Sequence, residues 1–286
     1  MKRNISPTLV LATVSIFLLF NSCTKDVPFR NFFNPLIGGC QVAEYHVTQF
    51  DPLFPTPPPY LFRKTFDPSG RIVQEIDCNF TDDILPADLL SSTLHLKIGQ
   101  KGPVVYLINK ASVKSDFPDT VVRIYLNEKG RPDSSIGGPG SDPQAGPGSF
   151  EKEYYTYKDN RVTDVKTNLT FIFNGNPISS DAVNTVTYDK FGNPLSFAGN
   201  SYTYDYTRKA RQQFYCDDFM GNESNFYLLQ YLGFFPEVTS PVNVRTGVNT
   251  GEDTGGPLTN QQFDEEGKLI GYAIDFIPVS ITWNCK

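Results

Sequence analysis

The residues best suited to acid–base chemistry in this 286-residue chain are clustered carboxylates. They occur as Asp82-Asp83, Asp217-Asp218 and Asp264-Glu265-Glu266. Two carboxyl groups held across a cleft can hydrolyse a glycosidic bond. Neighbours within a strand point to opposite faces of their sheet, however, and Asp264 has a structural role in a predicted turn. A glycoside hydrolase is therefore the last-ranked of our three functional hypotheses.

The remaining catalytic and ligand-binding signatures are missing from the sequence. Both histidines, His46 and His95, fall in predicted strands and not beside a nucleophile, which would need such a base. There is no Gly-x-Ser-x-Gly elbow, His-Glu-x-x-His helix or dinucleotide-binding glycine motif. Zinc pairs of the Cys-x-x-Cys type and an Asp-x-Asp-x-Asp-Gly calcium loop are also missing. We expect a non-enzymatic protein with no catalytic residue, metal or cofactor.

The cysteines predict a disulfide-bonded body. Cys23 follows an apolar segment, and the even number that remains (Cys40, Cys78, Cys216 and Cys285) is typical of structural disulfides in an oxidising compartment. Four cysteines allow three pairings. We favour Cys40–Cys78 with Cys216–Cys285, because the first pair flanks the first predicted hairpin.

The aromatic residues, 15 Tyr and 23 Phe, offer a possible binding surface. Tyr202, Tyr204 and Tyr206 recur at every second position and so share one face of a predicted strand. If exposed, they would form a flat platform for sugar rings or peptide. The alternative, which we favour, is that they fill the interior of the sheet or pair across strands.

The start of the chain predicts export. Lys2 and Arg3 precede an apolar segment, Leu9–Phe20, that is too short to span a bilayer comfortably and is typical of a secretory signal. We assign residues 1–22 to a signal peptide and residues 23–39 to a tether. The formal net charge of −6 becomes more negative without Lys2 and Arg3, which argues against a nucleic-acid partner.

One turn unit recurs along the chain and defines the expected architecture. An aromatic residue or leucine is followed by Asp or Asn, two further residues and Gly, at 66–72, 126–132, 188–195 and 263–269. The Asp or Asn side chain bonds the backbone two residues on, and Gly takes the left-handed conformation that closes a type I turn with a bulge. Each copy predicts a β-hairpin.

The other elements follow from alternating and helical spacing. Predicted strands are Gln41–Phe50, Tyr60–Phe66, Arg71–Phe80, Thr93–Ile98, Val104–Asn109, Val121–Asn127, Glu153–Tyr157, Arg161–Thr167, Leu169–Phe173, Thr185–Tyr188, Leu195–Ala198 and Ser201–Tyr206, with a last hairpin around Gly267. Residues 224–232 predict one short helix that ends at Gly233. Glycine-rich residues 136–148 and 247–257 predict flexible loops.

Together these elements predict an all-β protein. We expect residues 40–286 to form a single domain: one antiparallel meander sheet, curled or partly closed. The helix near 224–232 either plugs or covers an end of the sheet, or it fills the concave face, which aromatic side chains could fill instead.

The turn unit resembles the tyrosine–aspartate (YD) repeats of Rhs-type shells over most of residues 60–275. It also resembles uncharacterised Bacteroidota lipoprotein domains, one of which is described as porin-like in fold. The glycines at positions 70, 130, 192 and 267 lie further apart than successive YD repeats do. The resemblance therefore implies a smaller, open relative and not an encapsulating shell, and it carries no catalytic residues.

The sequence Phe20-Asn21-Ser22-Cys23 resembles a bacterial lipobox, although Phe20 and Asn21 replace the usual leucine and small residue. An ordinary structural cysteine at position 23 is the alternative. The start Ser-Cys-Thr-Lys-Asp is similar to that of Bacteroidota envelope lipoproteins. This resemblance implies lipidation at Cys23 and a place on the outer membrane, on the periplasmic side or, given Asp26, on the cell surface.

Two functional hypotheses lead. The first is a non-catalytic, lipid-anchored envelope scaffold that binds a partner protein or glycan. The second is a carrier whose concave sheet face shelters an apolar ligand such as lipid. A continuous apolar cavity would favour the carrier, and an interior filled by side chains would favour the scaffold.

Overall fold

A computed structural model describes residues 40–47, 61–70, 73–81, 91–109, 120–137, 150–173, 176–209, 211–216, 225–249, 256–274 and 277–285. The predicted signal peptide, Cys23 and the tether lie outside these residues, as do Asp82-Asp83, Asp217-Asp218 and most of both predicted flexible loops. No helix among the described residues is long and apolar enough to cross a membrane.

Thirteen strands form one antiparallel sheet, in the order β10-β9-β8-β7-β6-β5-β4-β3-β2-β1-β17-β16-β15. They are β1 (Gln41–Val47), β2 (Phe62–Phe66), β3 (Val73–Thr81), β4 (Ser91–Lys101), β5 (Val104–Asn109), β6 (Thr120–Leu126), β7 (Pro132–Gly137), β8 (Phe150–Lys158), β9 (Arg161–Phe173), β10 (Asn176–Thr185), β15 (Leu258–Phe263), β16 (Leu269–Ile274) and β17 (Ile277–Asn284). This confirms the predicted all-β antiparallel meander.

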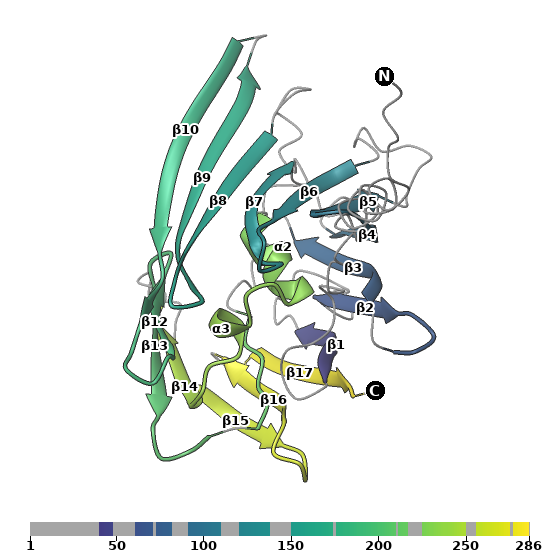
Figure 1. Cartoon of the computed structure of the whole chain (residues 1–286). Coiled ribbons are helices and arrows are strands. Elements are labelled where there is room, and N and C mark those ends of the chain that lie inside the picture. Colours follow the sequence, from purple (N-terminus) through teal and green to yellow (C-terminus); the bar gives the residue numbers. More distant parts are fainter. Residues whose placement is uncertain are drawn as a thin grey trace, which may run out of the picture.

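A second sheet of four strands has the order β11-β12-β13-β14. Its strands are β11 (Thr187–Tyr188), β12 (Pro194–Phe197), β13 (Asn200–Asp205) and β14 (Val244–Asn249). It approaches the large sheet through an isolated bridge between Gly247 and Pro257, beside which the Val248 N–H donates to the Gly256 carbonyl at 3.1 Å. The sheets curl around a common interior, as Figure 1 shows.

The four Asp/Asn–Gly turns form as predicted. In each, the glycine N–H donates to the Asp or Asn carbonyl three residues earlier, at 2.8–3.1 Å, and the glycine φ lies between 72° and 94°. The side-chain oxygen of Asp189 accepts from the N–H groups of Phe191 and Asn193 at 2.8 and 2.9 Å. A register shift marks the strand before each turn. Local side-chain chemistry therefore sets these hairpins.

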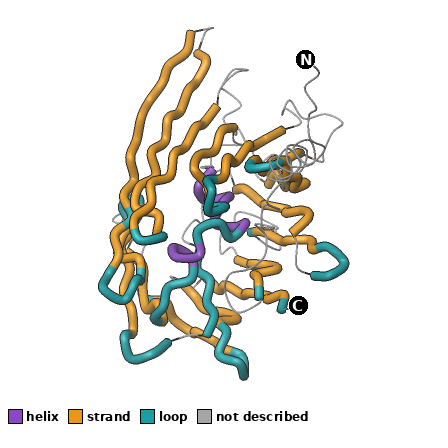
Figure 2. The backbone as a smooth tube through the Cα atoms, viewed as in Figure 1, coloured by secondary structure: helices purple, strands orange, loops and turns teal. Residues whose placement is uncertain are grey.

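Two helices fill the interior of the curled sheet (Figures 1 and 2). Helix α2 (Asn225–Leu232) is buried along its whole length, and Gly233 ends it with φ 87°. Helix α3 (Pro236–Thr239) follows directly. The predicted helix is thus confirmed, and of the two positions expected for it the structure shows the interior of the curled sheet and not one end.

Aromatic side chains join α2 to both sheets. Tyr231 of α2 stacks on Phe62 of β2 with ring centroids 5.0 Å apart, and Phe226 lies 4.7 Å from Phe197 of β12. Each such pair contributes about 0.5–1.5 kcal/mol beyond the burial of its area. The helix therefore holds opposite parts of the curled sheet together.

The disulfide pairing that we favoured from the sequence, Cys40–Cys78 with Cys216–Cys285, is wrong. Cys40 and Cys285 form the disulfide, and Cys78 and Cys216 are buried and take no part in it. The reason is topological: β1 and β17 are neighbours in the sheet, so the residues just outside them meet. Two cysteines that flank a hairpin in the sequence are not brought together by that hairpin.

Three strands, β7, β10 and β14, were not predicted, and one boundary of each predicted flexible loop was wrong. β7 begins at Pro132 and runs to Gly137, so Ile136 and Gly137 are strand residues and not part of a flexible loop. Similarly, Gly247–Asn249 belong to β14. β9 is one continuous strand of 13 residues where two were expected, and β10 pairs with it in full.

Candidate functional site

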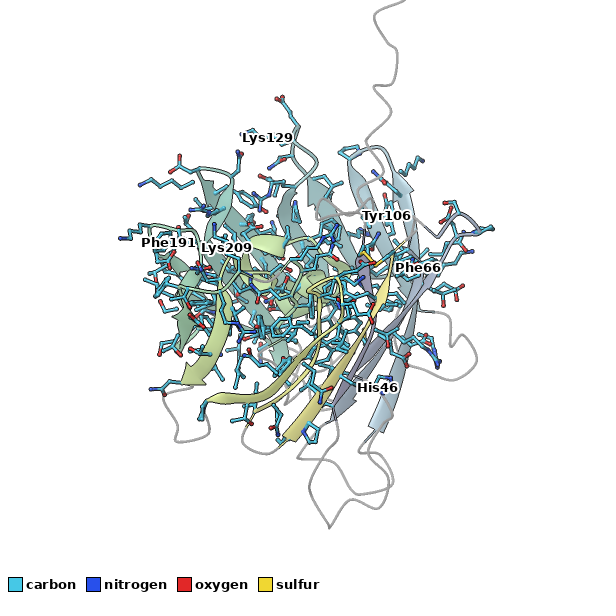
Figure 3. The ribbon with its side chains drawn as sticks, turned by 90° about the horizontal axis from the view of Figure 1, so that it is seen from below. His46, Phe66, Tyr106, Lys129, Phe191 and Lys209 are labelled. Carbon is cyan, nitrogen blue, oxygen red and sulfur yellow. A yellow bond between two sulfur atoms is a disulfide. The ribbon has the colours of Figure 1, made fainter. Side chains whose placement is uncertain are left out.

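The described carboxylate and histidine positions hold ion pairs and turns. The Asp264 carboxylate accepts from the Glu266 and Lys268 N–H groups at 3.0 and 2.8 Å, and the hydrogen bond from Lys268 holds the pKa of Asp264 below its usual value. His95 Nδ1 lies 2.8 Å from Asp77 on the neighbouring strand. Figure 3 places His46 at the periphery of the body, where it pairs with Glu44. None of these groups faces another acid across a cleft.

The two described cysteines outside the disulfide lie in the hydrophobic core. Cys78 and Cys216 have no exposed surface, and burial raises the pKa of the Cys78 thiol well above its ordinary value. The thiolate is the nucleophilic form of cysteine. A buried thiol that keeps its proton serves packing, and we assign Cys78 no chemistry.

The predicted tyrosine platform is not a surface feature. Tyr202 and Tyr204 are buried, the first with the Arg245 guanidinium 4.1 Å above its ring. The Tyr204 hydroxyl donates to the Pro194 carbonyl at 2.6 Å. Only the third tyrosine, Tyr206, is exposed, at 50%. The platform prediction is therefore wrong, and the alternative that these rings fill the interior is confirmed for Tyr202 and Tyr204.

The interior holds side chains from every part of the sheet. Its hydrophobic cluster runs from Val42 to Ile281 and includes the buried faces of both helices. A surface groove of about 430 Å³ lies outside this cluster. Its lining residues are Val183, Asn184, Thr185, Ser196, Phe197, Ala198, Gly199, Asn200 and Ser201. The groove lies between the end of β10 and the β12–β13 turn.

Strand β10 ends the large sheet on the side of this groove (Figure 1). All ten residues, Asn176 to Thr185, pair with β9 without a bulge. No second strand among the described residues pairs with it. Ten extended residues span about 33 Å. β10 is therefore a long, regular edge.

The alternation of hydrogen bonds between β10 and β9 shows which backbone groups of β10 point away from β9. The Val186 N–H donates to the Thr163 carbonyl at 2.8 Å, so Val186 and Thr163 form a hydrogen-bonded pair. Such pairs recur at every second residue of an antiparallel ladder. The N–H and C=O groups of Ser179, Asp181 and Val183 therefore point away from β9. Pro177, which has no N–H, stands at a fourth outward position, as is typical of an edge strand.

Side chains secure β10 to β9 and leave apolar groups in solvent. The Asn168 amide donates to Asp181 at 2.6 Å, and the hydroxyls of Thr170 and Ser179 lie 3.1 Å apart. Ile178 and Val183 are 54% and 61% exposed. Edge strands usually carry lysines, bulges or covering segments that prevent pairing. Within β10, Pro177 and the charged Asp181 are the residues of this kind, and the strand has no lysine and no bulge.

Our sequence analysis did not find this strand. Pro177, Ser179 and Asp181 have low strand propensity, and no alternating apolar pattern runs through them. The available signal in the sequence was the dipeptide Asn174-Gly175, which is typical of a tight turn, because a turn after a strand implies a returning strand.

Comparisons with known proteins define no family. No protein-family model matches the chain, and no curated protein matches it. Among solved structures, a porin-like protein from Bacteroides uniformis superposes with a TM-score of 0.43 and 11% sequence identity, covering 78% of this chain and 89% of that one. Lipidation and kinship with YD repeats, which we predicted from the sequence, stay predictions.

Proposed function

We propose that this protein is a non-catalytic, lipid-anchored scaffold of the bacterial cell envelope that binds a partner protein through β10. The open edge of β10 is the observation that carries the proposal. An extended segment of the partner would add a strand there, and main-chain hydrogen bonds would supply the affinity. The anchor would be the lipid on Cys23, in the outer membrane.

The edge defines the chemistry of the partner segment. Ser179, Asp181 and Val183 offer three outward N–H groups and three outward carbonyls, each bond contributing about 0.5–1.5 kcal/mol. An apolar side chain of the added strand would enter the groove beside Val183 and Phe197. The proposed partner segment is therefore extended, weakly charged and at least five residues long, by the span of about 3.3 Å per residue.

The filled interior argues for this function over the carrier of an apolar ligand. Lipid would need a continuous apolar cavity, and α2, α3 and the aromatic side chains occupy the corresponding space among the described residues. The surface groove of about 430 Å³ instead lies beside the end of β10, at Val183–Thr185, where a side chain of an added strand could enter it.

Photo-crosslinking in the native envelope tests the edge. A benzoylphenylalanine at Val183 on β10 should yield a defined adduct with a partner protein, mapped by mass spectrometry to an extended segment. The same group at Ile270 provides the matched control, because Ile270 is 36% exposed on β16, a strand that pairs on both sides. Equal adducts at both positions would contradict the proposal.

Two substitutions at Ser179 separate pairing from side-chain contact. Ser179→Pro removes an outward N–H, whereas Ser179→Ala removes only the hydroxyl that contacts Thr170. We expect the adduct at position 183 to be lost with proline and kept with alanine, while both variants unfold at the same temperature. An adduct that survives proline would rule out strand addition. The anchor is tested separately by fatty-acid labelling, which Cys23→Ala should abolish.

A further inference from the structure

A second exposed surface combines aromatic rings with cations. It consists of Lys190, Phe191, Tyr206, Arg208 and Lys209, and we call it the aromatic–basic tip. Phe191 and Tyr206 are 49% and 50% exposed, with ring centroids 5.4 Å apart. The Lys190 Nζ lies 5.0 Å from the Phe191 ring. Phe191 and Lys209 lie on the same side of the molecule in Figure 3.

Two turns assemble the tip from distant parts of the chain. The Asp189 turn places Lys190 and Phe191 at its apex. Asn193, which follows that turn, donates to Asn243 at 3.0 Å, and Asn243 in turn donates to the carbonyls of Tyr206 and Arg208. This chain of hydrogen bonds fixes one turn against the other, so the tip is a built surface.

The charge of the tip differs from that of the chain. The whole chain has a formal net charge of −6, whereas the three charged members of the tip, Lys190, Arg208 and Lys209, are all cationic and exposed. The nearby carboxylates of Asp189 and Asp205 are half-buried at the bases of the turns, where they accept hydrogen bonds from Phe191 and Thr207 N–H groups. The three cationic side chains are therefore more exposed to solvent than the two carboxylates.

We propose that the aromatic–basic tip seats the protein body on an anionic lipid surface. Rings with an apolar body beside long cationic side chains suit the headgroup level of a bilayer, where the rings enter the interface and the cations meet phosphate. Phe191 lies at the apex of the Asp189 turn with about half of its side chain exposed, so its ring can enter the interface. The surface is separate from the β10 edge, so this inference does not depend on strand addition.

Tryptophan fluorescence in the full chain tests the tip. The chain has a single natural tryptophan, Trp283, so Phe191→Trp adds one reporter to a constant background. Tyr154→Trp is the matched control. Tyr154 is likewise exposed, at 41%, and has the Lys152 Nζ 4.8 Å from its ring, but it lies on β8 and outside the tip. Both variants are mixed with vesicles of phosphatidylcholine, alone or with phosphatidylglycerol, that contain a brominated quencher lipid.

We expect several-fold stronger quenching of the added tryptophan in Phe191→Trp than in Tyr154→Trp, only in vesicles that contain phosphatidylglycerol. High salt and the added substitutions Lys190→Gln and Lys209→Gln should each remove the difference. Equal quenching at the two positions, equal quenching with phosphatidylcholine alone, or insensitivity to both salt and charge removal would overturn the proposal. A lipid anchor acts on both variants alike, so the comparison holds whether or not Cys23 is lipidated.

Discussion

Replacing Gly192 by alanine tests whether the Asp189 turn depends on both backbone conformation and close packing. Gly192 has φ +94°, where L side chains are strained. A Cβ atom there would lie 2.8 Å from Arg161 Cζ and still closer to Nη2. The Arg161 guanidinium, which sits 5.5 Å from the Tyr188 ring, would have to move away.

The expected loss of unfolding free energy has two parts. A left-handed conformation costs an L residue about 1–2 kcal/mol. Displacing Arg161 from the ring adds about 0.5–1 kcal/mol. Gly199 is the matched control, because it has φ +85° but nothing within 4 Å of its added Cβ. We expect a loss of about 2 kcal/mol for Gly192→Ala and about 1 kcal/mol for Gly199→Ala, with Gly192→Val costing more than either.

Equilibrium urea unfolding of the disulfide-bonded protein measures these values. In an Arg161→Ala background, Gly192→Ala should cost no more than Gly199→Ala does, since the crowding is gone. If Gly192→Ala unfolds with the parent midpoint, the turn assignment is wrong. If Gly192→Ala loses no more unfolding free energy than Gly199→Ala does while Arg161 is present, the argument that Arg161 crowds the added Cβ is refuted.

The disulfide, one buried ion pair and one buried lysine give three more predictions. Replacing Cys40 and Cys285 by alanine opens a loop with a sequence separation of 245 and should lower the unfolding free energy by about 3–5 kcal/mol; peptide mapping of the unreduced protein checks the pairing. Glu237→Ala leaves the nearly buried Arg131 without its ion-pair partner and should cost about 3 kcal/mol, whereas the exposed Lys166–Asp181 pair should contribute less than about 1 kcal/mol. Burial lowers the pKa of Lys64 from 10.5 to about 7. Between pH 10.5 and about pH 7 the Lys64 amine is protonated in the unfolded state but not in the folded state, so the free energy of unfolding should rise with pH across this window. Urea titrations at several pH values should show this rise in the parent protein and a flatter one in Lys64→Met.

The sequence predicted those features that short segments determine. Asp189 and Gly192 form their turn through bonds within five residues, and the spacing of residues 225–232 is enough to define α2. The cysteine pairing failed because it depends on which strands are neighbours, and β1 meets β17 across nearly the whole chain. Nothing local to Cys40 carries that information.

Both proposed surfaces were beyond prediction for similar reasons. β10 has a polar composition with a proline, so its pairing comes from the preceding turn and from the length of β9, not from its own propensity. The aromatic–basic tip needs the Asp189 turn and the segment at Arg208 to be held together through Asn243. In the sequence, these cations are isolated charges in an acidic chain, and we found no basic cluster there.

The position of β17 between β1 and β16 has a consequence for biogenesis. Residues 277–284 are synthesised after every other strand that the structure describes. Until they arrive, β1 lacks one of its two neighbours and the hairpin of β15 and β16 cannot join the remaining ten strands of its sheet. A polypeptide that ends before β17 would thus expose the unpaired edges of β1 and β16 to proteases and chaperones. The pairing of β17 with both edges is the step that would distinguish a complete molecule from a truncated one.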